Sequence, residues 1–313
     1  MRQMCEFDSG QLFSGRATGR MVKGWSEPNE YTPKPNPDYV FPQWMGDIFV
    51  WFRSLNEPLY IFGPTGCGKT SCLKQVAAKL NYGVYEVTGH SRLEFPELVG
   101  HHTVVDGNMK YEYGPLAKAM KEGGVFLINE MDLLDPSTAA GLNSILDGSP
   151  LCVPENGGEV IQPHPMFRFV ATANSNGTGD NTGMYQGILR QNIALLDRFV
   201  VCEATYLPGD VENKLVARVV PDLPDDTRDK LIEYCGMVRN LFLGKSAGGV
   251  DGTLEVTMST RTLLRAAQLI LLYEPFKKKG VDVIQYALDR ALCFKASHVS
   301  RQTLAECKQR VWG

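Results

Sequence analysis

The sequence predicts an α/β fold built on a parallel sheet, followed by a smaller helical domain, and three observations carry this prediction. Five short, nearly continuously apolar runs alternate with stretches of helical length between residues 57 and 207. A glycine-rich phosphate-binding pattern directly follows the first run. After Pro208 the apolar runs stop and amphipathic helical patterns replace them. Strands that are apolar throughout are typical of a parallel sheet covered by helices on both faces, so we expect a covered sheet and then a helical lid.

Composition narrows the class of protein. The 313 residues are 43% hydrophobic, which is enough for one large core or two unequal cores. Lys and Arg total 32 against 35 for Asp and Glu, so the net charge of -3 gives no electrostatic reason to expect a nucleic-acid partner or an anionic membrane. The eight cysteines show no C-x-x-C pairing, and neither a long apolar run nor a signal-peptide pattern occurs. We therefore expect reduced thiols and a cytoplasmic protein.

The predicted elements follow in chain order. Residues 1–40 end in the proline-rich "YTPKPNPDYVFP" and are predicted to be an extended N-terminal arm. Residues 41–207 are predicted to form the α/β nucleotide-binding domain with a five-stranded parallel sheet, and residues 208–313 the helical lid domain. The expected strands are "EPLYIFG" (57–63), "GVYEVTG" (83–89), "GVFLINE" (124–130), "FRFVATAN" (167–174) and "FVVCEATYL" (199–207). The D-G pair in "HTVVDGNMKYEY" and the N-G-G in "LCVPENGGEVIQ" predict two inserted β-hairpins.

The strongest motif is "GPTGCGKT", which stands between the first strand and the helix "KTSCLKQVAAKL". It fits the P-loop pattern G-x-x-x-x-G-K-[ST], in which backbone amides and a helix N-terminus bind phosphates. Lys69 is expected to reach the β- and γ-phosphates of ATP and Thr70 to offer its hydroxyl to Mg²⁺. The expected nucleotide-binding residues are Gly63, Pro64, Thr65, Gly66, Cys67, Gly68, Lys69, Thr70 and Ser71.

The strand "VFLINEMD" ends in Asn129 and Glu130 at the sheet edge where such folds bind ligands. Glu130 is expected to be the general base for the attacking water. Asn129 stands where ATPases of this type carry aspartate, and the weaker hydrogen bond of an amide loses about 1–2 kcal/mol, roughly tenfold in metal affinity or rate. We therefore predict slowed hydrolysis, because loss of the base itself would cost about a hundredfold to ten-thousandfold. On this argument Asn129→Asp raises turnover or lowers the Mg²⁺ requirement, whereas Asp132 is expected to be an exposed loop carboxylate.

Three further polar residues are candidates for the chemistry. Asn174 ends the strand expected beside Glu130, where an amide can hold the attacking water or contact the γ-phosphate. Arg198 directly precedes the last strand. Arg261 lies in the first turn of a lid helix, where a cation opposes the helix dipole and a phosphate is the obvious compensation. Surface salt bridges remain the alternative for both arginines.

Together, "GPTGCGKT", "VFLINEMD", "HPMFRFVATAN", "LLDRF" and "STRTLL" resemble the AAA+ ATPases of the MoxR clade, and most closely the CobS type of ATPase subunit of aerobic cobaltochelatase. The likeness continues through "GTGDNTGMYQG" and the closing "LAECKQRVWG". It implies a hexameric ring with ATP at subunit interfaces, Asn174 as γ-phosphate sensor, Arg198 as a finger reaching a neighbour's ATP and Arg261 as lid sensor. It also implies a partner with a von Willebrand A-type domain, and for the chelatase a large chelatase subunit.

The sequence departs from the clade at two positions. Besides Asn129, Thr88 stands where these proteins commonly place an asparagine that restrains the catalytic glutamate. The hydroxyl of Thr88 is the remaining candidate for that restraint. Both departures bear on the rate and its regulation and not on nucleotide binding.

In this clade the hairpins face the pore of the ring, and Met109, Tyr111 and Tyr113 are candidates either to grip a polypeptide or to pack against a neighbouring subunit. His101 and His102 point to opposite faces of a strand, so we expect a solvated pair and not a chelate. The function we predict is an ATP-hydrolysing ring motor that remodels a partner. A nucleotide-gated assembly scaffold with little hydrolysis is the alternative, and a DNA-associated motor ranks third.

Overall fold

The computed structural model describes residues 2–179, 187–247, 249–250 and 252–313. Most of the motif "GTGDNTGMYQG" therefore lies outside the described residues. The chain divides into two compact units. The first comprises Met1–Pro64 and Lys69–Thr205, and the second comprises Thr65–Gly68 and Tyr206–Gly313. Within the described part of the chain, no helix is both long enough and apolar enough to cross a membrane.

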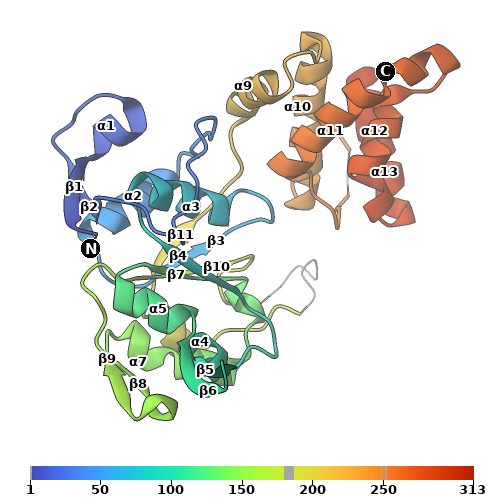
Figure 1. Cartoon of the computed structure of the whole chain (residues 1–313). Coiled ribbons are helices and arrows are strands. Elements are labelled where there is room, and N and C mark those ends of the chain that lie inside the picture. The colour runs from blue at the N-terminus through green and yellow to red at the C-terminus, as the bar shows by residue number, and fades with distance from the viewer. Residues whose placement is uncertain (1, 180–186, 248, 251) are drawn as a thin grey trace. The chain divides into compact units, whose positions relative to one another are not determined.

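The first unit is organised around a five-stranded parallel sheet (Figure 1). Its strands lie in the order β11-β3-β10-β7-β4, and they are β3 (Leu59–Phe62), β4 (Val84–Thr88), β7 (Val125–Asn129), β10 (Arg168–Ala173) and β11 (Val200–Glu203). All five are the strands that the apolar runs predict. Parallel pairing aligns Thr88 with Asn129 and Ala171 with Ile128. Thr88 and Asn129, which end β4 and β7, and Asn174, which follows β10, therefore lie at one edge of the sheet.

Helices cover both faces of this sheet (Figure 1). One face carries α2 (Met45–Ser54) and α3 (Lys69–Lys79), and the other carries α4 (Phe95–Val99), α5 (Pro115–Glu122), α6 (Pro136–Gly141) and α7 (Asn143–Leu146). Leu73 and Val76 of α3 are fully buried, as are Leu116 of α5 and Phe126 of β7. The expectation that every strand is buried on both faces is wrong for the edge strand β11, where Val201 is 54% exposed, because an edge strand has fewer neighbours to cover it.

Residues 4–25 form two strands and a helix, which corrects the expectation of an extended arm over residues 1–40. β1 (Met4–Asp8) pairs antiparallel with β2 (Met21–Trp25), and α1 (Ser9–Ser14) lies between them. The side chains of Val22 and Trp25 are buried, and the Trp25 indole donates a hydrogen bond to the carbonyl of Gly123 at 3.1 Å. Burial of these apolar groups offsets the entropy cost of ordering the segment.

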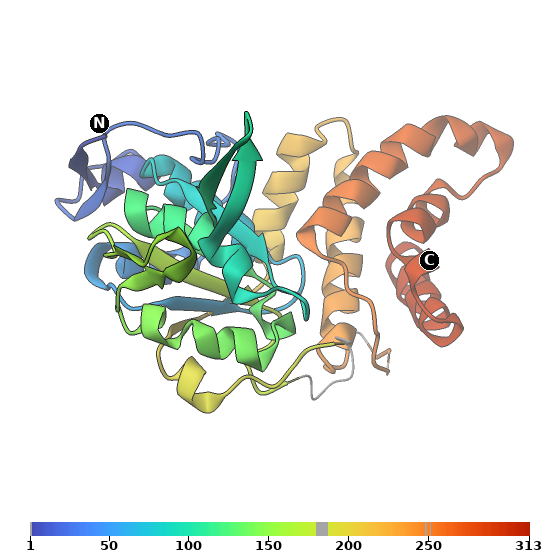
Figure 2. The same cartoon turned by 60° about the horizontal axis from the view of Figure 1, so that its bottom comes forward.

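Both predicted hairpins are present. β5 (Gly100–Val105) pairs with β6 (Asn108–Tyr113), and β8 (Leu151–Val153) pairs with β9 (Glu159–Ile161) around the 3₁₀ turn η2 (Pro154–Asn156). In the first hairpin Asp106 has φ 50° and Gly107 has φ 77°, as the D-G signal for a tight hairpin turn requires. The β5–β6 hairpin extends beyond the helices around it (Figure 2). Its histidines are exposed, and the described residues hold no metal-binding cluster of three or more His, Cys, Asp or Glu side chains.

The second unit is helical, as predicted. Its helices are α9 (Gly209–Val219), α10 (Asp225–Phe242), α11 (Thr260–Tyr273), α12 (Val283–Ala291) and α13 (His298–Trp312), with 3₁₀ turns η3 (Glu274–Lys279) and η4 (Cys293–Lys295). Leu231, Val238, Leu263 and Leu304 lie in a core shared by these helices. The last helix, α13, has 15 residues.

Candidate nucleotide-binding site

The phosphate-binding loop joins β3 to α3, and Lys69 is the first residue of that helix. The Lys69 ammonium donates hydrogen bonds to the carbonyl oxygens of Gly63 at 2.7 Å and Pro64 at 3.1 Å. It also donates to the side-chain oxygen of Asn174 at 3.0 Å. Two candidates that are 105 residues apart in the sequence are therefore in direct contact, because β3 and β10 are neighbours in the sheet.

Glycine is required in this loop for two different reasons. Gly66 and Gly68 have φ of 69° and 96°, a region that side chains rarely adopt. A Cβ atom at Gly63 would lie 2.1 Å from the carbonyl oxygen of Ala204, so no larger residue fits there. Cys67 is buried within the loop, whereas Ser71 is exposed in the first turn of α3. A loop of this shape directs its backbone amides towards an anion at the helix N-terminus.

A second corner of the site is suited to Mg²⁺. The Thr70 hydroxyl donates to the side-chain oxygen of Asn129 at 2.5 Å, and the Thr172 hydroxyl donates to the same oxygen at 3.1 Å. Hydroxyl and amide oxygens can be ligands of a hard cation. Mg²⁺ is commonly held by one or two protein oxygens together with phosphates and water. The residues present therefore fit a nucleotide-bound Mg²⁺, which Thr70 and Asn129 would hold.

Asn129 also contacts a residue that the sequence analysis missed. Its amide nitrogen donates to a carboxylate oxygen of Glu86 at 2.5 Å. Glu86 lies on β4, two residues before Thr88, and the register of β4 with β7 places it on the same face as Asn129. The alternation along "VYEVT" places Glu86 on the same face of its strand as Thr88. The contact with Asn129 could not be predicted from this, because it depends on β4 and β7 being neighbours in the sheet.

Glu130 follows β7 directly and is exposed at the edge of the sheet. Its backbone is left-handed, with φ 55° and ψ 46°, which is uncommon for a residue with a side chain. The amide of Gly89 donates to the carbonyl oxygen of Asn129 at 2.7 Å, and this bond ties the end of β4 to the residue before Glu130. Within the described part of the chain, no hydrogen bond joins the Thr88 hydroxyl to Glu130, so the restraint suggested for Thr88 is not formed there.

Asp132 is fully buried, which corrects the expectation of an exposed loop carboxylate. The chain turns inward after β7 in the 3₁₀ helix η1 (Met131–Leu133). There the Asp132 carboxylate accepts hydrogen bonds from the backbone amides of Asn174 at 2.8 Å and Ser175 at 3.1 Å. Burial raises the pKa of Asp132, and these two amides oppose that shift. Asp132 therefore holds the chain where Asn174 leaves β10.

The two candidate arginines lie in different units and have different surroundings. Arg198 follows α8 (Ile193–Leu196) and forms a two-bonded ion pair with Asp147, with distances of 2.7 and 3.1 Å. Hydrogen bonding from Arg198 lowers the pKa of the Asp147 carboxyl. Arg261 is exposed in the first turn of α11, and among the described residues its side chain has no ion pair. An ion pair is thus observed for Arg198, whereas none is observed for Arg261 among the described residues.

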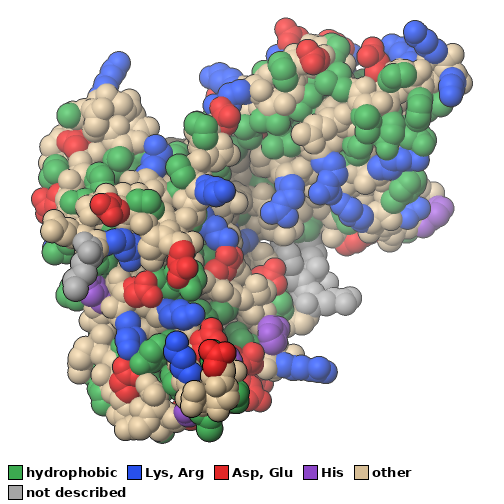
Figure 3. All heavy atoms as spheres, viewed as in Figure 1, with side chains coloured by type: hydrophobic (Ala, Val, Ile, Leu, Met, Phe, Trp, Pro, Cys, Tyr) green, Lys and Arg blue, Asp and Glu red, His purple; other side chains and the backbone are tan. Residues whose placement is uncertain are grey.

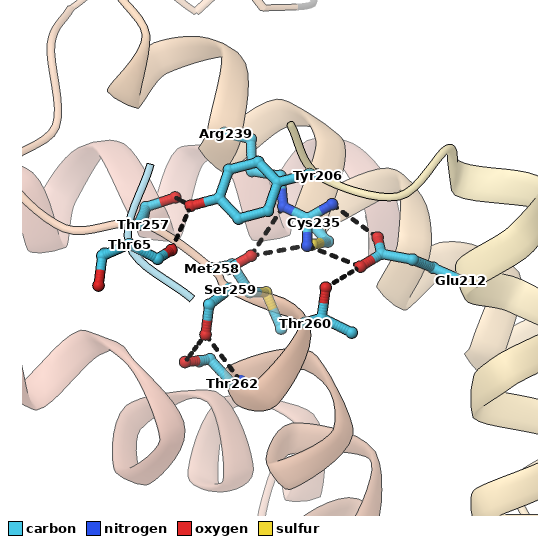
Figure 4. A network of polar contacts seen from close by, with 10 residues as sticks. All are labelled: Thr65, Tyr206, Glu212, Cys235, Arg239, Thr257, Met258, Ser259, Thr260 and Thr262. Carbon is cyan, nitrogen blue, oxygen red and sulfur yellow. Dashed lines mark hydrogen bonds and ion pairs between the residues drawn. The ribbon is translucent and has the colours of Figure 1, made fainter. Parts of the chain in front are cut away.

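Within the second unit, a buried polar network reaches the phosphate-binding loop (Figure 4). Glu212 and Arg239 form an ion pair with distances of 2.6 and 2.9 Å, and both are almost completely buried. The guanidinium of Arg239 lies 4.1 Å from the centre of the Tyr206 ring. The Tyr206 hydroxyl donates to the carbonyl oxygen of Thr65 at 2.8 Å. The sequence analysis missed this network, because no local pattern links its members.

Comparison with known proteins shows the family of this chain. Residues 58–191 match the family described as "AAA domain (dynein-related subfamily)", and residues 212–311 match "CbbQ/NirQ/NorQ C-terminal". The aerobic cobaltochelatase subunit CobS of a Sinorhizobium species is 29% identical over 96% of this chain and 88% of its own length. The denitrification regulatory protein NirQ of Stutzerimonas stutzeri is 30% identical over 77% of this chain and 78% of its own.

A solved structure shares the fold. The RuvB Holliday junction branch migration motor of Thermotoga maritima covers 83% of this chain and 72% of its own, with a TM-score of 0.50 and 13% identity. The parallel sheet, the phosphate-binding loop and the helical C-terminal region define a P-loop ATPase of the AAA+ class. Within that class, the chain belongs to the MoxR clade, in which an AAA domain precedes a CbbQ/NirQ/NorQ-type C-terminal domain.

Proposed function

We propose that this protein is a Mg²⁺-dependent ATPase that works as a ring-shaped motor and remodels a partner protein or complex. One observation carries the proposal: the contacts Lys69–Asn174 and Thr70–Asn129 bring the phosphate-binding loop to the sheet edge where Glu130 stands. We assign the chemistry to the α/β domain, residues 41–207, and the role of lid to residues 208–313.

In this proposal each residue of the chain has a defined task. The loop amides and Lys69 bind the phosphates of ATP, and Thr70 holds Mg²⁺. When bound, Mg²⁺ neutralises charge that develops on the phosphate oxygens. Glu130 takes the proton of the attacking water, and Asn174 orients that water against the γ-phosphate. The amide of Asn129 replaces a carboxylate beside the metal, so we expect hydrolysis to be slowed and not abolished.

Assembly completes the site in this proposal. Members of the AAA+ class commonly form oligomeric rings, and we propose a hexamer in which Arg198 leaves Asp147 to reach the ATP of a neighbouring subunit. An arginine supplied in this way contributes about a thousandfold or more to the rate. Arg261, which has no ion-pair partner in the described residues, would sense the phosphate from the lid. A slow isolated subunit and a faster assembly follow from this arrangement.

The partner is proposed from the relatives alone. CobS is named as a subunit of aerobic cobaltochelatase and is similar over 96% of this chain. We therefore propose a partner of the chelatase type, comprising a von Willebrand A-type domain protein and a large chelatase subunit. Acidic and basic side chains are interspersed over the face of the first unit in Figure 3, which offers no basic stripe for a nucleic acid.

A nucleotide-gated scaffold is the second candidate, and Asn129 is the observation that favours it. Phosphate release by assembled protein over a Mg²⁺ titration separates the two functions. We expect slow release that rises with Mg²⁺ and falls about a hundredfold to ten-thousandfold in Glu130→Gln. Absence of release at saturating Mg²⁺, with co-purified partner present, would favour the scaffold. Equal release by Glu130→Gln and the unsubstituted protein would refute the assignment of the general base.

A further inference from the structure

The side chain of Asn129 connects Thr70 to a carboxylate on a different strand. Its oxygen accepts from the hydroxyls of Thr70 and Thr172, and its nitrogen donates to Glu86. A carboxylate can only accept hydrogen bonds, and an ammonium or amide N–H can only donate them. Glu86 therefore permits only one orientation of the Asn129 amide, the one in which the oxygen faces Thr70.

This orientation is important because the two ends of an amide differ towards a cation. The oxygen is an acceptor that can bind a metal or its water, whereas the nitrogen carries two donor hydrogens with partial positive charge. An aspartate at this position would present an oxygen in either orientation. An asparagine presents one only if something fixes the amide, and in the described residues Glu86 is the carboxylate in contact with it.

Resting on the function proposed above, we propose that Glu86 is a positioning residue for the Mg²⁺–ATP corner of the site. It holds the Asn129 oxygen towards Thr70 and polarises the amide through a charge-assisted hydrogen bond, which is roughly twice as strong as a neutral one. Glu86 and Asn129 together thus take the place of the single aspartate found in related ATPases.

Glu86 has a further partner in Lys74. Its ammonium forms an ion pair with the second carboxylate oxygen of Glu86, and the two side chains are 32% and 33% exposed. Lys74 lies four residues after Thr70 on α3, hence on the same side of the helix. Because Lys74 balances the charge of Glu86, the effect of Glu86 on Mg²⁺ is exerted chiefly through the orientation of Asn129.

The arrangement also revises the expectation for Asn129→Asp. That substitution alone would place a second carboxylate where the amide nitrogen now lies 2.5 Å from Glu86. Like charges in direct contact are destabilising. The gain expected from restoring the aspartate should therefore appear only when Glu86 is also replaced by glutamine, whose amide can donate to the new carboxylate.

The test uses full-length protein carrying Glu130→Gln, so that it measures binding and not turnover. A fluorescent ATP analogue is titrated with Mg²⁺ to give the half-saturating Mg²⁺ concentration. We expect Glu86→Gln to raise that concentration about threefold to tenfold, because a charge-assisted bond becomes neutral. Lys74→Met, the matched control that removes the surface ion pair alone, should change it less than twofold. Asn129→Asp alone should not lower the half-saturating Mg²⁺ concentration. The double variant Asn129→Asp with Glu86→Gln should lower it.

Each contrary result has a distinct meaning. Equal half-saturating Mg²⁺ concentrations for Glu86→Gln and Lys74→Met would show that Glu86 is only a surface ion-pair partner. The proposal for Glu86 would then be wrong. The same holds if Asn129→Asp lowers the Mg²⁺ requirement equally with and without Glu86. If the protein with only Glu130→Gln shows no Mg²⁺-dependent binding of the analogue, the proposed function fails and this inference fails with it. Circular dichroism of each variant checks that its fold is retained.

Discussion

The Asp132 carboxylate accepts a hydrogen bond from the backbone amide of Asn174 at 2.8 Å, deep inside the first unit. The two residues lie after neighbouring strands, and Asn174 contacts Lys69 through its side chain. The placement of Asn174 beside Lys69 therefore depends in part on the Asp132 carboxylate.

Replacing Asp132 by leucine should leave the amides of Asn174 and Ser175 without an acceptor. We expect a loss of about 1–3 kcal/mol in the free energy of unfolding. We also expect a decrease in kcat of roughly tenfold to a hundredfold, because Asn174, which we propose orients the attacking water, moves. Urea unfolding and steady-state phosphate release measure the two effects. If Asp132 acts through Asn174, Asp132→Leu should not slow Asn174→Ala any further. Additive losses in the double variant would contradict that pathway.

On the function proposed above, in which Arg198 acts on a neighbour's ATP, Arg198→Ala should lower turnover about a thousandfold in the assembled protein. Specific activity measured against protein concentration should rise for the unsubstituted chain and stay flat for the variant. Asp147→Asn is the matched control, because it also removes the ion pair but leaves the arginine. An equal loss of activity in Asp147→Asn would show that the pair itself matters and that Arg198 is structural.

Glu212→Ala should destabilise the helical unit by about 3–5 kcal/mol, the usual cost of leaving one partner of a buried ion pair alone. The carboxylate of Glu212 also accepts a hydrogen bond from Thr260 at 2.5 Å, so its loss affects two elements. Asp225→Ala serves as control, because the side chain of Asp225 is 85% exposed in its pair with Arg228 and the pair should contribute less than about 1 kcal/mol. Similar urea midpoints for the two variants would disprove the prediction.

The contact between the two hairpins should depend on pH. Glu159 accepts hydrogen bonds from Lys121 at 2.8 Å and Tyr113 at 2.5 Å, and these donors lower the pKa of Glu159 to about 2. A lowered folded-state pKa contributes stability above the unfolded value of about 4.3 and loses it as the pH falls towards 2. The difference in Tm between the unsubstituted chain and Glu159→Gln should therefore shrink between pH 5 and pH 2. A difference that is constant over that range would show that Glu159 does not contribute through its charge.

The sequence predicted those parts of the fold that local patterns specify. The five apolar strands, the D-G turn at Asp106 and the loop ending at Lys69 each carry their signal within a few residues. The sequence did not reveal contacts that depend on strand order, so Glu86 was missed although Asn129 was singled out. Asp132 was misjudged for a related reason, because the inward turn of η1 is set by packing beneath β10 and not by propensity.

The three candidate contact residues of the first hairpin differ in their surroundings. Tyr111 packs edge to face on Tyr113, with ring centres 5.3 Å apart, so both rings already have partners within their own chain. Met109 is 73% exposed at the same hairpin. Of the three residues that the sequence offered for contact with a polypeptide or a neighbouring subunit, Met109 is therefore the one whose side chain is available.

The left-handed backbone of Glu130 places stability and activity in opposition at one position. Such a conformation costs a residue with a side chain about 1–2 kcal/mol relative to the right-handed form, and glycine would avoid most of that cost. Glu130→Gly should therefore raise the Tm, and on the function proposed above it would remove the general base. Attempts to increase the thermal stability of this protein should therefore keep glutamate at position 130, although its backbone conformation is strained.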